Sequence, residues 1–339
     1  MEIAGEMHPN SQSPHDVAGS APRISIVVPA YNEEGNLPTL YAELADVLHA
    51  LKMPWEIVLV DDGSTDKTWE EILALHQRDG RVKGLRLSRN FGHQYALFAG
   101  LTHATGDAVV SMDADLQHPP HVIPELVDEW HKGSKIVHTV RMDRESTSWF
   151  KRVASRLFYR VYSFASGVEL ENGMADFRLL DRQVIAGLSQ LREEELFLRG
   201  LVQWIGFPSS KVAFRCQDRL SGRSKYTLGK MVKLAWSSIT SFSIIPLRVG
   251  LLIGILTSLI SFGGILYALG SDLIGFVVPG WTSIVSIISF LFGILFIMLG
   301  IIGEYIGRIL MEVKGRPRFL VSAQVGIERP LGDSGGLER

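Results

Sequence analysis

Two pairs of aspartates in this chain have spacings that could do chemistry. Asp113 and Asp115 stand one residue apart, directly after the apolar run 108–112. Two carboxylates so placed on a turn can converge on a hard divalent cation, Mg²⁺ or Mn²⁺, that also binds a diphosphate, and Gln117 adds a nearby oxygen ligand. An Asp-X-Asp triplet alone is also common in solvated turns. Its position after an apolar strand favours the metal site, where the cation would neutralise charge on a departing nucleoside diphosphate.

Asp61 and Asp62 form the second pair, which ends the apolar run 56–60. Acidic residues at the end of a strand can bind the ribose hydroxyls and base edge of a nucleotide. The alternative is a structural turn followed by a helix cap. That alternative fully accounts for Ser64 and Asp66, but it accounts less well for two adjacent acids.

Basic residues gather in two later segments. Residues 141–160 hold Arg141 and five further cations with aromatic residues interleaved at helical spacing. Such a helix suits a membrane surface, where arginines can hold a lipid phosphate. A helix packed on the sheet with solvated arginines explains this stretch alone at least as well. The second segment, Arg219-Leu-Ser-Gly-Arg-Ser-Lys225, could close over phosphates or form a plain surface loop.

Both aspartate pairs require a scaffold, and the sequence predicts an α/β one. Short apolar runs at 24–28, 56–60, 82–87 and 108–112 alternate with helical patterns such as 36–51 and 66–77. Strands that alternate with helices indicate a mostly parallel, doubly wound sheet. Ligands bind such sheets beyond the carboxyl ends of the strands. The polar clusters follow those ends, so we expect them to lie together.

Two apolar segments predict membrane helices. Residues 249–269 and 284–302 are each close to the length that crosses a bilayer, and Asp272 is the only formal charge between 249 and 302. Basic residues flank the pair and are missing from the connecting loop, which places both termini in the cytoplasm. The predicted plan is a disordered start (1–22), an α/β domain (23–225), an interfacial helix (226–246), two spans (247–305) and a cytoplasmic tail (306–339). A domain-packing helix is the alternative for 226–246.

Composition gives no sign of a nucleic-acid partner and excludes two kinds of cysteine site. The 34 basic and 36 acidic residues nearly cancel, which does not suggest a nucleic-acid partner. The chain has a single cysteine, so an internal disulfide or a multi-cysteine metal cluster is excluded.

Taken together, several motifs resemble the family 2 glycosyltransferases of GT-A fold, and within them the polyprenyl-phosphate glycosyltransferases. The resemblance runs from about residue 24 to 321, and its strength lies in the order and joint presence of motifs that are individually modest. They are Val28-Pro-Ala-Tyr-Asn-Glu33, Asp61-Asp-Gly-Ser64, Leu87-Ser-Arg-Asn-Phe-Gly-His93, Asp113-Ala-Asp-Leu-Gln117, Ala175-Asp-Phe-Arg178, Gly222-Arg-Ser-Lys-Tyr226 and Gly303-Glu-Tyr-Ile-Gly-Arg308.

This resemblance implies a role for each matching residue. The nucleotide would contact Pro29, Tyr31, Glu33, Asp61 and Asp62. The metal and diphosphate would be held by Asp113, Asp115 and Gln117, and the acceptor phosphate by Arg141, Arg152 and Ser155. A closing loop would bring Arg223 and Lys225 to a phosphate. Asp115 and Asp176 are the predicted catalytic residues, with Asp176 either a base or a group that orients the sugar or acceptor.

The implied reaction is transfer of a hexose from a sugar nucleotide to polyprenyl phosphate, with inversion. The Ala175-Asp-Phe-Arg178 motif favours the branch that uses UDP-glucose and undecaprenyl phosphate. Other donors or lipid acceptors, and a non-catalytic membrane scaffold that binds sugar nucleotides, are the alternatives. The resemblance further implies a multi-pass protein of the inner membrane that forms homo-oligomers, and a flippase is a possible partner.

Overall fold

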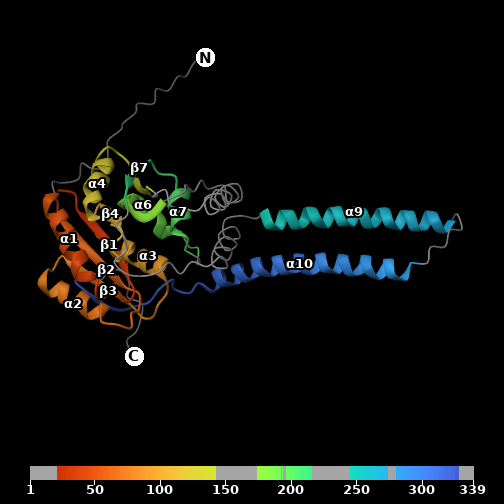
Figure 1. Ribbon diagram of the computed structural model, residues 1–339, viewed down its shortest axis with the longest axis horizontal. Helices are drawn as coiled ribbons and strands as arrows, with labels where there is room; N and C mark the ends of the chain where they lie inside the picture. The colour runs from red at the N-terminus through yellow and green to blue at the C-terminus, as the bar shows by residue number, and fades with distance from the viewer. Residues whose placement is uncertain are drawn as a thin grey trace, which may run out of the picture.

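The structure, a computed structural model, consists of an α/β domain and two long helices that extend from one side of it (Figure 1). It describes residues 21–142, 174–191, 193, 196–215, 245–273 and 280–327. In the described part, eight strands form one sheet in the order β7-β5-β6-β4-β1-β2-β3-β8.

Four parallel strands make the centre of the sheet and confirm the α/β prediction. They are β1 (Ile24–Ala30), β2 (Trp55–Asp61), β3 (Val82–Leu87) and β4 (Ala108–Ser111). Beside β4 the pattern changes, because β6 (Met174–Asp181) runs antiparallel to both β4 and β5 (Ile136–Arg141). The edge strand β7 (Ser209–Phe214) is parallel to β5.

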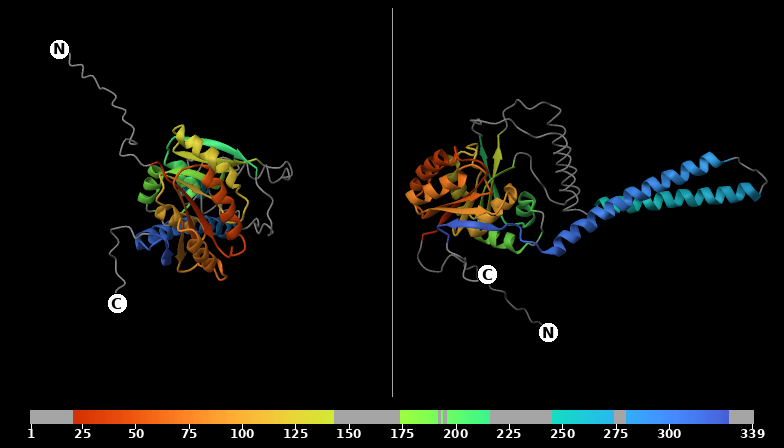
Figure 2. Two further views of the ribbon diagram at one scale, coloured as in Figure 1. Left: turned by 90° about the vertical axis from the view of Figure 1, so that its left-hand side faces the viewer. Right: turned by 90° about the horizontal axis from the view of Figure 1, so that it is seen from below.

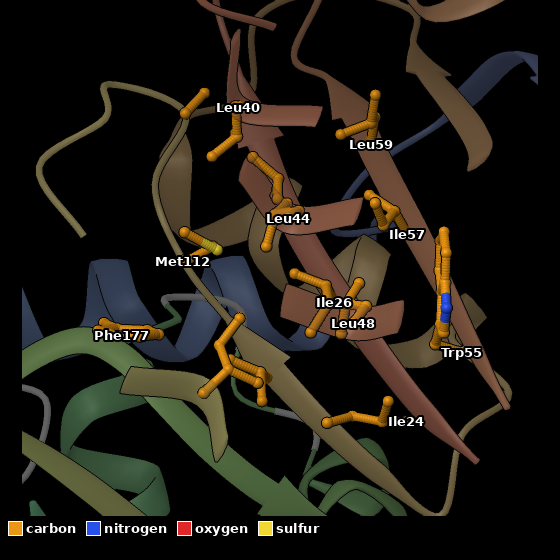
Figure 3. Close-up of a cluster of buried hydrophobic side chains, with 14 of the residues drawn as sticks. Ile24, Ile26, Leu40, Leu44, Leu48, Trp55, Ile57, Leu59, Met112 and Phe177 are labelled. Atoms are coloured by element: carbon orange, nitrogen blue, oxygen red, sulfur yellow. The ribbon is translucent and has the colours of Figure 1, made fainter. Parts of the chain in front are cut away.

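Helices cover both faces of the sheet because successive side chains of a buried strand point to opposite faces. On one face Ile24, Ile26 and Val28 pack in the cluster that contains the buried leucines of α1 (Leu37–Ala50). Figure 3 shows Ile24 and Ile26 with Leu44 and Leu48 of that helix. That layer also contains α2 (Thr68–Arg78), the short 3-10 helix η1 (Pro120–Val122) and α4 (Ile123–His131). On the other face Val27 packs with α3 (His93–His103), α6 (Arg182–Gln190) and α7 (Leu198–Trp204).

The two predicted spans fall in α9 (Ile245–Leu273) and α10 (Trp281–Lys314), which run side by side away from the domain (Figures 1 and 2). Large apolar side chains are exposed along both helices. Gly254 lets α10 approach, since Met298 lies within van der Waals reach of the place where a Cβ would stand. Among the described residues, one stretch, Phe290–Lys314 within α10, is long and apolar enough to cross a membrane. A shorter apolar stretch, Val249–Gly264, lies within α9.

The segment after α10 returns to the domain, which the sequence did not predict. Gly315, in the left-handed conformation, ends the helix. Phe319 then packs into the cluster beneath α3 and α7, and the amide of Ser88 donates to the carbonyl of Leu320 at 2.8 Å. The following strand, β8 (Val321–Val325), pairs antiparallel with β3. The end of the long helix is therefore attached to the sheet.

One predicted helix begins differently. Arg141 is the exposed last residue of strand β5, not the start of the amphipathic helix expected over 141–160. Residues 143–160 and nearly all of 226–246 lie outside the described residues.

Candidate active site

The turn Asp61-Asp-Gly-Ser64 is built into the protein at the carboxyl end of β2. Gly63 has φ +68°, and a Cβ there would lie 2.4 Å from the carbonyl carbon of Arg89. This close approach lets the carboxylate of Asp62 accept the amides of Phe91 (2.8 Å) and Gly92 (2.9 Å). Asp61 accepts the amide of Ser64 at 2.8 Å and is ion-paired with Arg86 at 3.2 Å.

Both acids of this pair are buried and engaged in protein contacts. Burial raises the pKa of Asp62, and its two backbone hydrogen bonds oppose that shift. The two carboxylates therefore hold neighbouring backbone in place rather than projecting into open solvent. Their nucleotide role stays a prediction.

The loop after β1 lies against this turn. The amide of Asn32 donates to Oγ of Ser64, and that of Glu33 donates to Oγ1 of Thr68, both at 2.9 Å. Tyr31 on this loop is 44% exposed, which is unusual for a large side chain in the domain. Pro29 is buried within β1, so any contact with a ligand would come through its surroundings.

The Asp113-Ala-Asp-Leu-Gln117 turn follows β4 and is held by two devices. Leu116 adopts a left-handed conformation, φ +60°, that non-glycine residues rarely take. The amide of Asp113 donates to Nδ1 of the buried His118 at 3.0 Å, so that nitrogen carries no proton. Burial lowers the pKa of His118, which keeps the ring neutral.

Acidic side chains concentrate around this turn. Burial raises the pKa of Glu33, and the negative charges of Asp115, Asp66 and Asp113 add to the effect. Oδ1 of Asp113 is buried and makes no hydrogen bond, although Nε2 of His93 lies 3.4 Å away. A buried carboxylate oxygen without a hydrogen bond, within a group of acids, is suited to a cation.

These residues fit a metal ion that is shared with a ligand. Among the described residues, no three His, Cys, Asp or Glu side chains are grouped closely enough to hold a metal by themselves. Mg²⁺ is commonly held by one or two carboxylates and completed by substrate phosphates and water. Asp113 and Asp115 supply that number, with Gln117 half-buried beside them.

Asp176 lies on the neighbouring strand β6, and two arginines hold its carboxylate. Nη2 of Arg178 donates to Oδ1 at 2.6 Å. Arg199 donates from Nε to Oδ1 at 2.9 Å and from Nη2 to Oδ2 at 2.8 Å. Burial alone would raise the pKa of Asp176, but the guanidinium groups of Arg199 and Arg178 hold it well below its usual range.

His93 connects Asp176 with the Asp113 turn. Its Nε2 lies 3.8 Å from Oδ2 of Asp176 and 3.4 Å from Oδ1 of Asp113. The two strands are also joined directly, since Oγ of Ser111 donates to the carbonyl oxygen of Asp176 at 2.6 Å. The acids of the β4 turn and Asp176 therefore belong to one site.

The structure thus brings together most of the predicted residues that it describes. The carboxyl ends of β1, β2 and β4 place Tyr31, Glu33, Asp61, Asp62, Asp113, Asp115 and Gln117 at one edge of the central strands. Arg141 ends β5, and no contact of its side chain with the cluster is described. The positions predicted to bind phosphate, Arg152, Ser155, Arg223 and Lys225, lie outside the described residues.

Four residues of the site were missed by the sequence predictions: His93, Gln94, Arg178 and Arg199. His93 and Arg178 belong to motifs that were noticed, so their position beside the aspartates was the available signal. Arg199 is 23 positions from Asp176 and carries no local signal. Gln94 links Asp176 with the start of α7. Its side-chain Nε2 donates to Oδ2 of Asp176 at 3.4 Å, and its Oε1 accepts the backbone amide of Leu198 at 3.2 Å.

Comparison with known proteins gives consistent matches. Residues 25–188 match the model of the family "Glycosyl transferase family 2". An uncharacterized glycosyltransferase of Synechocystis is 41% identical over 90% of this chain and 96% of its own. The bactoprenol glucosyl transferase of Shigella phage SfX is 40% identical over 89% of this chain and 99% of its own. Among solved structures, glucosyl-3-phosphoglycerate synthase of Mycobacterium tuberculosis aligns with a TM-score of 0.45 at 20% identity, over 66% of this chain and 80% of its own.

Proposed function

The chain belongs to glycosyltransferase family 2, and we propose that it transfers glucose from UDP-glucose to the phosphate of undecaprenyl phosphate with inversion. The observation that carries the proposal is the match to the bactoprenol glucosyl transferases. It covers 99% of the length of the phage SfX relative, and so includes the long apolar helices as well as the α/β domain.

The acidic turn supports a metal-dependent version of this chemistry. Asp113, Asp115 and Gln117 would hold Mg²⁺ or Mn²⁺, which when bound supplies charge neutralisation for the departing diphosphate. The loops after β1 and β2 would position the nucleotide, with Tyr31 exposed enough to pack against a base.

In the proposed reaction an oxygen of the lipid phosphate attacks the anomeric carbon of glucose. The bond from that carbon to the diphosphate breaks, and UDP leaves with the electron pair. A phosphate monoester has its second pKa near about 6, so the nucleophile is largely dianionic at neutral pH and needs no general base. Positioning and charge stabilisation would then supply most of the rate.

Asp176 then has a role other than general base. A carboxylate that accepts hydrogen bonds from two arginines, with its pKa held below the usual range, is a weak proton acceptor. We infer that Asp176 anchors the guanidinium groups and orients the reacting groups.

The membrane topology belongs to the same proposal. We expect α9 and α10 both to cross the inner membrane, with the α/β domain and both termini in the cytoplasm, because the acceptor cannot leave the bilayer. Tethering the enzyme confines its search to the membrane surface. Homo-oligomerisation, a flippase partner and the interfacial helix at 226–246 stay predictions.

The test uses the purified full-length protein in lipid nanodiscs with radiolabelled UDP-glucose. We expect label in undecaprenyl phosphate glucose, identified by mass, only when Mg²⁺ or Mn²⁺ and undecaprenyl phosphate are present. Parallel reactions contain diacylglycerol as acceptor, or other sugar nucleotides as donors. Transfer to diacylglycerol, preference for another donor, or binding of UDP-glucose without turnover would each contradict the proposal.

A further inference from the structure

Arg199 is the exposed member of the group around Asp176. Its side chain is 43% exposed, whereas those of Asp176 and Arg178 are 7% and 4% exposed. Arg178 is thus enclosed by protein and forms an ion pair with the carboxylate of Asp176. Arg199 contacts the same carboxylate, although its side chain as a whole is far more exposed.

The orientation of Arg199 is fixed from two directions. The carboxylate of Asp176 accepts hydrogen bonds from both Nε and Nη2 of Arg199, and these two bonds fix the orientation of the planar guanidinium group. Gln94 bridges Asp176 and the amide of Leu198, so the beginning of α7 is tied to α3 as well. An arginine held in this way loses little conformational entropy when it binds a further anion.

The side-chain chemistry of Arg199 suits an anionic phosphate. One carboxylate, that of Asp176, lies between the guanidinium groups of Arg178 and Arg199. His93 connects this group to Asp113 of the predicted metal site. Arginine favours phosphate because its fork of N–H donors fits two oxygens at once.

The location of α7 is on the side of the domain that faces the long helices, as Figures 1 and 2 both show. Phe319, which follows the end of α10, packs into the same apolar cluster as Leu198 and Leu201 of α7. Trp204 at the end of α7 is 61% exposed, and indole side chains favour the membrane interface. A lipid-borne phosphate would arrive from this side.

We propose that Arg199 is a further substrate-binding residue, which holds a phosphate oxyanion next to the Asp113–His93–Asp176 group. The proposal rests on the proposed function. The oxyanion can come from the lipid acceptor, which the position of α7 favours, or from the diphosphate of the donor.

The experiment compares Arg199→Gln and Arg199→Lys in the full-length protein in nanodiscs. Arg81→Gln is the matched control, because Arg81 makes the same two-bond contact to Asp79 and is 45% exposed, but directly precedes β3, away from the site. Initial rates give kcat and KM for each substrate, and calorimetry with UDP gives donor-side affinity without turnover.

We expect Arg199→Gln to raise one KM by about 10- to 100-fold, the range for a lost charge-assisted hydrogen bond. Arg199→Lys should recover part of the loss, and Arg81→Gln should change neither KM. A higher KM for undecaprenyl phosphate with unchanged UDP affinity identifies the acceptor, and weaker UDP binding identifies the donor.

Both KM values and the UDP affinity within twofold of wild type in Arg199→Gln would overturn the proposal. So would a loss confined to kcat that Arg199→Lys shares in full. If Arg199→Gln does not fold, the same comparison is made with Arg199→Lys, where unchanged KM values overturn the proposal. A wild-type protein that makes no lipid product refutes the proposed function separately. Calorimetry of Arg199→Gln with UDP and with undecaprenyl phosphate, each without turnover, then decides whether Arg199 binds phosphate, because affinities within twofold of wild type for both overturn the proposal.

Discussion

Replacing Asp176 with Asn should destabilise the protein strongly, because it leaves the buried guanidinium of Arg178 without its counter-charge. The two groups are 2.6 Å apart and almost fully buried. At an effective dielectric constant of about 20 their attraction is roughly 6 kcal/mol. Asn keeps one acceptor and the site can relax, so we expect a loss of about 3–5 kcal/mol, the range for breaking a buried ion pair.

The assay is urea unfolding of the full-length protein in detergent, followed by tryptophan fluorescence, since Trp55, Trp69 and Trp130 are buried in the domain. The double variant Asp176→Asn with Arg178→Met removes both charges and should recover most of the loss. A single variant within about 1 kcal/mol of wild type would refute the buried-pair argument, as would a double variant no more stable than the single one.

The same ion pair predicts how stability depends on pH. The pKa of Asp176 is lowered in the folded protein. Its contribution to the free energy of unfolding is therefore complete above the pKa of about 3.9 that Asp has in the unfolded chain, and it is lost as pH falls below that pKa. The stability difference between wild type and Asp176→Asn should therefore be constant from about pH 6 to pH 8 and should narrow below about pH 4. A difference that narrows as pH rises above 6 would contradict the assigned ionisation.

Three further predictions test the site and its support. Asp115→Asn should abolish transfer with unchanged unfolding, because it removes a predicted metal ligand from a half-buried turn; retained turnover would overturn the metal assignment. Gly63→Ala should cost about 2–4 kcal/mol in urea unfolding, through its positive φ and the clash with Arg89, whereas Gly35→Ala, with open space around it, should be nearly neutral. Truncation after Gly315 should speed hydrogen exchange of the β3 amides, since β8 pairs with that edge; unchanged exchange would refute that support.

Much of the site was predictable because its parts are local. The turns that follow β2 and β4 each contain an acidic pair within a few residues, and apolar runs of strand length precede them. The pairing of β1 with β2 and β4 then brings the two turns to one edge. The role of the Asp62 carboxylate was harder to predict, because its hydrogen-bond partners lie in the separate segment around Phe91.

The sequence by itself determined the alternation of strands and helices, the two acidic turns and the long apolar helices, since each follows from the residue types within one short segment. Only the tertiary structure decided what surrounds Asp176. Antiparallel pairing of β6 with β4 sets Asp176 beside the turn that contains Asp113 and Asp115, and packing of α7 on α3 adds Arg199 from 23 positions away. The same holds for β8, whose partner β3 lies more than 230 positions earlier in the chain. Such contacts depend on how distant segments pack, so the residue types within one short segment do not predict them.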